Sequence, residues 1–279
     1  MYKRYLSYPH LLWMTAFVLA PIVLVLLYSV QSADGGRFTL ENYAQFFKDP
    51  SYMGILLKSV WIAVISSVFC LVLGFPAAMI LSNRDKRRAA QGKKGGSYLL
   101  LFVMPMWMNM LLRTYAWLTI LEKNGLLNSF LELFKLPHLN ILYTSGAVVL
   151  GMVYNFIPFM ILPIYSVLIK IDDSIIEAAE DLGANKLRVY WKIIFPLALP
   201  GVISGITMVF LPAVTTFIIS QLLGGGHYML FGNLIEQQFL RAGNWNFGSA
   251  LSIIMMVLVF LAMQLMKLFN RGQQEIAMF

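Results

Sequence analysis

Six long apolar runs alternate with shorter polar segments along this chain of 279 residues. Each run is continuous rather than alternating, and each has about the 20 residues that a helix needs to cross a bilayer, whereas barrel strands need only about 10. The pattern predicts an all-α polytopic membrane protein in which residues 1–279 form a single transmembrane domain. The predicted spans lie near residues 9–30, 55–81, 98–121, 145–169, 200–222 and 248–269.

The polar segment between the fourth and fifth runs begins with signals for a helix. Ser174 followed by Glu177 predicts a capping box, and Asp172 and Asp173 have the charge that suits a helix N-terminus. Gly183 predicts the end of this helix, because glycine readily adopts the left-handed conformation that closes one.

A second helix is expected directly after this glycine. Asn185 can cap it, and we expect it to end before Pro196, because the residue before a proline disfavours helical geometry. A helix, glycine turn and helix between two spans suggests that a partner outside the membrane uses this segment.

This segment resembles the EAA loop of the permease subunits of ABC importers. The matching residues, in order, are Glu177, Ala178 and Ala179, then Gly183, then Ile193 and the pair Phe195–Pro196, where the family usually has leucine in place of Phe195. The resemblance implies that residues 170–199 form a cytoplasmic coupling loop that sits in a groove of an ATPase, with Glu177 anchoring the loop by cap and ion-pair contacts. The residues that it assigns to this coupling are Glu177, Ala178, Ala179, Asp181, Leu182, Gly183 and Ala184.

Composition and charge support a membrane setting independently. The chain is 59% hydrophobic and 12% charged, with a mean hydropathy of +0.73, which excludes an ordinary soluble domain. Its net charge of +8 sits in short segments beside the apolar runs, so it predicts topology rather than nucleic-acid binding. Both termini and the EAA segment are expected on the cytoplasmic side. That side would receive Lys3, Arg4, Arg84, Lys86, Arg87, Arg88, Lys93, Lys94, Lys170, Lys186, Arg188, Lys192, Lys267 and Arg271.

Signals of enzymatic chemistry are weak. The histidines at 10, 138 and 227 are far apart and have no companions at metal-binding spacing, so we expect no metal site. Cys70 stands alone inside an apolar run, and the pair Gly92–Lys93 lacks the other residues of a phosphate-binding P-loop. We therefore expect no catalytic residue and no bound cofactor, and we expect ATP and Mg²⁺ to be used by a partner ATPase.

A wider resemblance covers nearly the whole chain. The stretches FTLENY (38–43), CLVLGFPAA (70–78), IPFMILPIYS (157–166) and FGNLIEQQFL with NWNFG (231–248) are similar to PotB-like spermidine/putrescine permeases. This resemblance implies the type I ABC importer permease fold, alternating access driven by ATP, and a place in a bacterial cytoplasmic (inner) membrane. It also implies a homologous second permease (PotC-like), a dimer of ATP-binding subunits (PotA-like) and an extracytoplasmic solute-binding protein (PotD-like).

A polyamine is a flexible polycation that carboxylates and aromatic faces would hold. The candidate pathway residues are Trp107, Asn109, Tyr115, Tyr154, Phe217 and Gln221. The acidic partners are missing, because none of the six runs carries an Asp or Glu deep within it. Arg113 lies in the outer half of the third run and would repel a polycation. We expect the second permease to supply the carboxylates, and Arg113 to pair with Glu122, with a partner acid or with backbone carbonyls.

Three alternatives remain open. An ABC permease for an anionic or carboxylated solute would welcome Arg113. An ion-coupled secondary carrier usually has ionisable residues or broken helices at mid-membrane, and the sequence shows neither signal. A membrane scaffold without transport would leave the aromatic and proline-containing spans unexplained.

Close helix packing is expected at Gly201 and Gly205, a small-xxx-small pair that lets the fifth span approach a neighbour. The outer segments 31–54 and 122–144 have enough apolar residues to form short amphipathic helices at the membrane interface.

Overall fold

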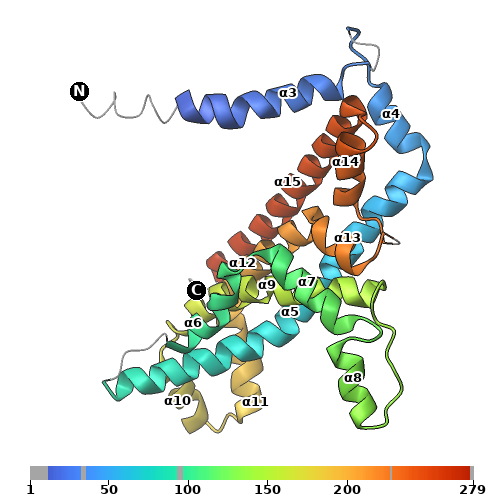
Figure 1. Cartoon of the computed structure of the whole chain (residues 1–279). Helices are drawn as coiled ribbons and strands as arrows, with labels where there is room; N and C mark the ends of the chain where they lie inside the picture. The colour runs from blue at the N-terminus through green and yellow to red at the C-terminus, as the bar shows by residue number, and fades with distance from the viewer. Residues whose placement is uncertain (1–11, 33–35, 93–96, 227, 277–279) are drawn as a thin grey trace. The chain divides into compact units, whose positions relative to one another are not determined.

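A computed structural model describes residues 12–32, 36–92, 97–226 and 228–276 (Figure 1). The described residues form helices, apart from turns, loops and an isolated β-bridge between Gln31 and Phe38. Contacts divide the chain into two compact units. Unit 1 comprises Met1–Lys58 with Leu230–Leu261, and unit 2 comprises Ser59–Met229 with Ala262–Phe279.

The predicted all-α fold with membrane-spanning helices is confirmed. Five helices among the described residues are long and apolar enough to cross a bilayer, and a bent helix pair supplies a sixth candidate. The first predicted span, 9–30, begins outside the described residues. The candidate spans are Leu12–Ser29, Pro50–Ala90, Ser145–Leu168, Lys186–Thr215 and Trp245–Phe269, with Tyr98–Trp107 and Met110–Leu133 as the bent pair.

The third predicted span, 98–121, is broken into two parts in the structure. Helix α6 (Ser97–Val103) tightens into the 3-10 turn η2 (Met104–Trp107), and α7 (Met110–Leu121) begins after a short break. The stretches Tyr98–Trp107 and Met110–Leu133 on either side of the break make an angle of 94°. Pro105 in η2 has no N–H to continue the helical ladder. Asn109 starts α7 anew, because its side chain accepts a hydrogen bond from the first turn.

The second helix of the EAA segment does not end before Pro196. Helix α11 (Lys186–Val189) continues through the π-helical turn η3 (Tyr190–Ile194) into α12 (Phe195–Thr215). The wide turn pairs the N–H of Phe195 with the carbonyl of Tyr190, and Pro196 lies in the first turn of α12. The wide turn before it accommodates the proline, which has no N–H to donate.

The fifth span also ends earlier than predicted, because α12 stops at Thr215 and not near residue 222. Thr216 is extended, and the short helix α13 (Ile218–Leu223) follows it. Pro212 lies in the last turn of α12, where it weakens the helix.

Unit 1 is held together by aromatic rings and amide side chains. It contains η1 (Thr15–Leu19), α3 (Ala20–Ser29), α4 (Glu41–Lys48), α14 (Phe231–Leu240) and the first parts of α5 (Pro50–Ala90) and α15 (Trp245–Ile276). Phe46 packs edge-on against Phe231, with ring centroids 5.9 Å apart. The amides of Asn42 and Asn246 each donate a hydrogen bond to the carbonyl of Gln31.

Helix α3 and the preceding turn η1 bury almost no side chains, and Ser29 is the buried residue of this stretch. Helix α4 confirms the short helix expected within 31–54.

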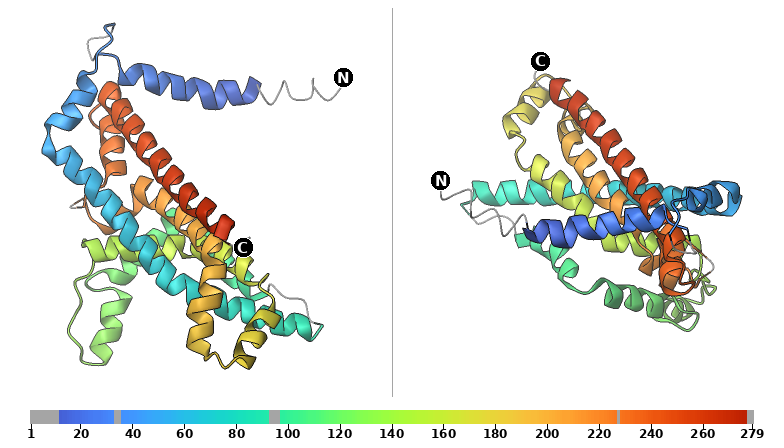
Figure 2. Two further views of the ribbon diagram at one scale, coloured as in Figure 1. Left: turned by 180° about the vertical axis from the view of Figure 1, so that it is seen from behind. Right: turned by 90° about the horizontal axis from the view of Figure 1, so that it is seen from above.

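Unit 2 is built around α9 (Ser145–Leu168), which packs along α12, as Figure 2 shows from two further sides. Met160 of α9 is fully buried, and glycines of two neighbouring helices face it. A Cβ added to Gly74 of α5 would lie 3.0 Å from the Met160 side chain, and one added to Gly205 would lie 2.6 Å from its sulfur. A Cβ on Gly201 would lie 2.8 Å from the carbonyl oxygen of Pro163. The predicted close approach at Gly201 and Gly205 is confirmed.

Helix α8 (Leu126–Leu133) confirms the second expected short helix, within 122–144. Its buried Asn128 fastens the segment, because the side chain donates to the carbonyls of Glu122, Lys123 and Leu139 and accepts from the N–H of Leu139.

Adding a methyl group at the contact between α9 and α12 should destabilise the fold. We expect Gly201→Ala to lower the free energy of unfolding by about 1–3 kcal/mol, because the new Cβ would overlap backbone of α9. The thermal unfolding midpoint of the purified protein in detergent measures this effect. Gly54→Ala is the matched control, since a Cβ added to that helical glycine meets no atom within 4 Å; equal midpoints for both variants would contradict the packing argument.

Candidate functional site

The EAA segment forms two short helices, α10 (Asp173–Asp181) and α11, between α9 and α12 (Figure 1). Asp172 is the N-cap of α10, because its carboxylate accepts a hydrogen bond of 3.0 Å from the N–H of Ser174. That bond holds the pKa of Asp172 below its usual value. The predicted capping box of Ser174 and Glu177 is wrong, because the helix begins earlier than expected and the aspartate caps it.

The predicted stop at Gly183 is confirmed. Gly183 has φ of +83°, in the left-handed region. Its N–H donates to the carbonyl of Glu180 at 2.9 Å, and the N–H of Ala184 donates to the carbonyl of Ala179 at 3.0 Å. These two bonds satisfy carbonyls that the helix end would otherwise leave unpaired. The predicted cap of α11 is confirmed as well, since Asn185 accepts a 2.8 Å hydrogen bond from the N–H of Arg188.

Large apolar side chains of this segment remain exposed. Helix α10 buries none of its residues. The exposed apolar residues are Ile175 (45%), Leu182 (90%), Leu187 (67%) and Trp191 (57%). Large apolar side chains that stay exposed on a polar segment are candidates for contact with a partner. We call these four residues the apolar surface of the loop.

The predicted coupling residues differ in how far they are exposed. Glu177, Ala178, Asp181, Leu182 and Gly183 are exposed, and Ala179 and Ala184 are half-buried. Glu177 has neither an ion pair nor a side-chain hydrogen bond within the described part of the chain. Its exposed side chain therefore forms no cap or ion pair inside the described chain, and the expected anchoring of the loop by Glu177 stays a prediction.

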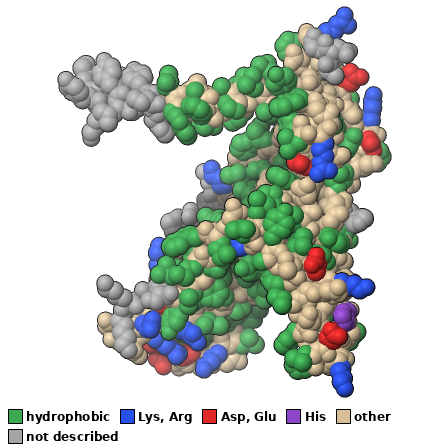
Figure 3. Space-filling view, in the orientation of Figure 1, with side chains coloured by type: hydrophobic (Ala, Val, Ile, Leu, Met, Phe, Trp, Pro, Cys, Tyr) green, Lys and Arg blue, Asp and Glu red, His purple; other side chains and the backbone are tan. Residues whose placement is uncertain are grey.

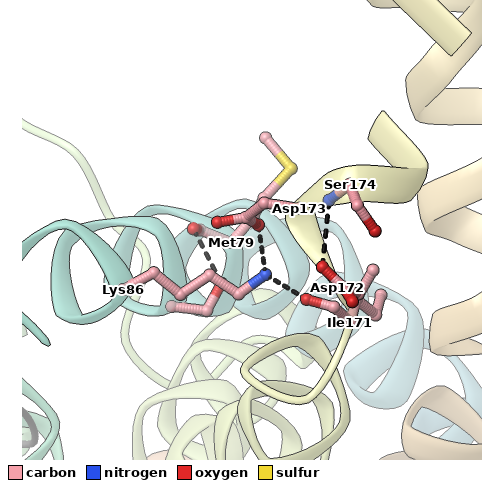
Figure 4. A network of polar contacts seen from close by, with 7 residues as sticks. Met79, Lys86, Ile171, Asp172, Asp173 and Ser174 are labelled. Carbon is pink, nitrogen blue, oxygen red and sulfur yellow. Dashed lines mark hydrogen bonds and ion pairs between the residues drawn. The ribbon is translucent and has the colours of Figure 1, made fainter. Parts of the chain in front are cut away.

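Lys86 of α5 connects to the start of α10 (Figure 4). Its Nζ lies 2.7 Å from Oδ1 of Asp173, which is the only ion pair among the residues that the structure describes. The same ammonium donates to the carbonyl of Ile171, in the link between α9 and α10. The sequence placed Lys86 in a basic cluster and gave no sign of these partners.

The neighbouring Asp85 is a buried carboxylate that the sequence patterns did not single out. It is 2% exposed, and its Oδ2 accepts a 2.7 Å hydrogen bond from the hydroxyl of Tyr165 in α9. Its Oδ1 has no hydrogen-bond partner in the described chain. A signal existed, because buried residues of α5 recur every three or four positions through Ala78, Leu81 and Ser82 and continue to Asp85.

Basic residues gather over the end of α5 and α6 (Figure 3). Arg84 and Arg88 both lie over the ring of Tyr98, at 5.8 Å and 4.6 Å from its centroid. The basic residues Lys3, Arg4, Lys93 and Lys94 lie outside the described residues, as do His10 and His227.

The six candidate pathway residues lie on η2, α7, α9 and α13 or at their ends. Trp107 and Asn109 flank the break before α7, Tyr115 lies on α7, Tyr154 on α9, and Phe217 and Gln221 at α13. Helices α7, α9 and α13 contact one another. The ring of Tyr154 packs edge-on against Trp117 of α7, with centroids 5.3 Å apart. The structure therefore brings together the helices that carry these residues, while their role in a pathway stays a prediction.

Arg113 of α7 is 8% exposed, and its Nε and Nη1 have no hydrogen-bond partner in the described chain. It forms no ion pair with Glu122, so that expected pairing is wrong. A buried guanidinium without partners is costly unless a group outside the chain pairs with it.

Comparisons with known proteins agree with this architecture. A family model described as the binding-protein-dependent transport system inner membrane component matches residues 52–275. The chain is 39% identical over 271 residues to the spermidine/putrescine transport system permease protein PotB of Haemophilus influenzae, covering 93% of this chain and 92% of that protein. It is 38% identical over 255 residues to PotB of Escherichia coli, covering 88% of this chain and 90% of that protein.

The fold has a solved counterpart. A chain in the crystal structure of a bacterial alginate ABC transporter, in complex with an alginate pentasaccharide-bound periplasmic protein, superposes with a TM-score of 0.78 at 14% identity. The match covers 97% of this chain and 93% of that one. The chain therefore belongs to the family of binding-protein-dependent transport system inner membrane components, and it is a permease subunit of an ABC importer.

Proposed function

We propose that this permease subunit carries polyamines such as spermidine and putrescine across the bacterial inner membrane by alternating access, together with a second, homologous permease. The observation that carries this proposal is its 36–39% identity, over most of both chains, to permeases named for spermidine and putrescine transport. Both termini and the α10–α11 segment face the cytoplasm in this proposal, because most basic residues then lie on that side.

The α10–α11 segment is the docking element for a dimer of ATP-binding subunits. The chain lacks a P-loop, so ATP and Mg²⁺ belong to those subunits. The apolar surface of the loop, led by Leu182, supplies the contact area that such docking needs. An extracytoplasmic solute-binding protein delivers the cargo to the opposite side.

Aromatic side chains fit a polyamine cargo, because cations bind the faces of aromatic rings. Trp107, Tyr115, Tyr154 and Phe217 keep between 37% and 78% of their surface exposed. Asp85 is a buried carboxylate of unit 2, but it already accepts a hydrogen bond from Tyr165. The second permease is therefore the proposed source of the carboxylates that bind the ammonium groups.

A second candidate cargo is an anionic or carboxylated solute. The observation that favours it is Arg113, whose buried guanidinium has two nitrogens without partners in the described chain. In the polyamine proposal, an acidic residue of the second permease pairs with Arg113 instead.

Competition experiments separate the two cargoes. In proteoliposomes that hold the complete transporter and its binding protein, we expect unlabelled putrescine to suppress uptake of labelled spermidine, because both are flexible polycations. Sulfate and alkylphosphonates should leave that uptake unchanged. ATP-dependent uptake of the anions, with no uptake of spermidine, would replace the first proposal by the second.

Removing the charge of Arg113 tests its pairing across the interface. We expect Arg113→Gln to lower spermidine uptake by about tenfold or more, because it leaves the partner's buried acid unpaired. Arg113→Lys keeps the charge and should retain part of the activity. Uptake equal to that of the unmodified transporter in the Gln variant would show that Arg113 is dispensable.

Altering the α10–α11 turn should uncouple transport from ATP hydrolysis. We expect Glu177→Ala combined with Gly183→Asp to lower uptake by about tenfold, because aspartate is strained at a φ of +83° and brings a charge beside Leu182. Uptake and ATP hydrolysis are measured on the same proteoliposomes, and circular dichroism checks the helices. Glu132→Ala, which removes an exposed carboxylate from α8, is the matched control. Normal coupling in the double variant would show that this loop is not the coupling element.

A further inference from the structure

We propose that Asp85 and Lys86 of α5 are positioning residues that lock the coupling helix α10 to α5, so that the two move together during the transport cycle. We call the two side chains with their partners Tyr165, Ile171 and Asp173 the α5 latch. This inference rests on the proposed role of α10 as the docking element for the ATPase.

The two latch residues are adjacent on α5 but reach different elements. Asp85 accepts the hydrogen bond from Tyr165, which lies in the last turn of α9. Lys86 extends to the carbonyl of Ile171 and to the carboxylate of Asp173, the first residue of α10. The latch therefore holds the chain on both sides of the junction between α9 and α10, as the contacts of Lys86 in Figure 4 illustrate.

Helix α10 has few other means of keeping its position. None of its side chains is buried, and among the other elements it packs mainly against α11. Beside its covalent ends and its contact with α11, Lys86 ties the first turn of α10 to the membrane-spanning helix α5. The ion pair of Lys86 and Asp173 therefore contributes more to the position of α10 than the exposure of the two side chains alone would suggest.

The contact between Asp85 and Tyr165 is more deeply buried than the contact between Lys86 and Asp173, and the two have different roles. The Asp85 side is enclosed, because that residue is 2% exposed and continues the buried stripe of α5. The Lys86 side chain is 16% exposed, and that of Asp173 is 61% exposed. The enclosed contact fixes α5 to α9, and the open contact joins α10 to that pair while leaving it accessible to an ATPase.

The location gives the latch a mechanical consequence. Helix α5 runs without interruption from Pro50 to Ala90 and carries Gly74, which contacts Met160 of α9. A displacement of α10 by the ATPase is therefore passed to a long membrane-spanning helix through Lys86, and not only to α9 and α12 through the chain.

The test compares charge removal with charge exchange in the assembled transporter. We expect Lys86→Met and Asp173→Asn each to reduce spermidine uptake per ATP hydrolysed by about threefold to tenfold. The double variant Lys86→Met with Asp173→Asn should be no worse than Lys86→Met alone, because that change already removes the ion pair together with the contact to Ile171. The exchange variant Lys86→Asp with Asp173→Lys should recover the part of the coupling that depends on the ion pair, although a carboxylate at position 86 cannot restore the bond to the carbonyl of Ile171. Arg87→Met, which removes a neighbouring exposed charge, is the control and should couple normally.

Hydrogen exchange supplies a readout that does not depend on cargo. Backbone amides of residues 171–181 should exchange about threefold faster in Lys86→Met and Asp173→Asn than in the unmodified complex, and Arg87→Met should leave them unchanged. Tyr165→Phe removes the enclosed hydrogen bond and should also speed exchange at the junction of α9 and α10. Asp85→Asn can still accept the bond from Tyr165 and should speed exchange by a smaller factor.

Two results would overturn the proposal. One is normal exchange and normal coupling in Lys86→Met and Asp173→Asn; the other is impaired single variants with no recovery in the exchange variant, since the pair would then not be the cause. If the unmodified complex takes up no spermidine, the proposed cargo fails, but the exchange rates and the ATP hydrolysis stimulated by the binding protein still decide on the latch.

Discussion

The arrangement of unit 2 depends on how closely α9 approaches α12 and α5. In a bilayer, burial of apolar side chains gives little net drive for helices to associate, so contact depends on tight packing. Met160 of α9 fills that role between Gly74 and Gly205, and Gly201 lets α12 lie against the backbone of α9. The α10–α11 segment begins where α9 ends and finishes where α12 begins. The glycine contacts therefore also set the distance that this segment must bridge.

Within that frame, local hydrogen bonds shape the loop and leave its apolar side chains for a partner. Asp172, Gly183 and Asn185 satisfy the helix ends without using the surface of α10. Lys86 ties the start of the same segment to α5. A rigid shape fastened to a long helix suits an element that transmits displacement, because the loop keeps its form while it and α5 move together.

Much of this could be predicted from the sequence, because long apolar runs and glycine or asparagine at helix ends act locally. The spans, the stop at Gly183 and the cap at Asn185 follow from such signals. A proline such as Pro105 signals a kink, but the sharpness of the bend there and the π-helical turn before Pro196 could not be predicted, since proline can be accommodated in several ways and neighbouring turns decide which. The bond between Asp85 and Tyr165 joins residues 80 positions apart, and no local pattern encodes such a pairing.

The exposure of Leu182 has a consequence for a permease subunit that has not yet joined its partners. A leucine that is 90% exposed to water stays there only as long as no partner covers it, and its burial is worth about 1.5–3 kcal/mol. Copies of the permease made in excess of the ATPase would present this side chain to chaperones and proteases, which recognise accessible apolar segments. In the proposed docking to an ATPase, the same leucine that the partner covers would thereby link the lifetime of the subunit to its assembly.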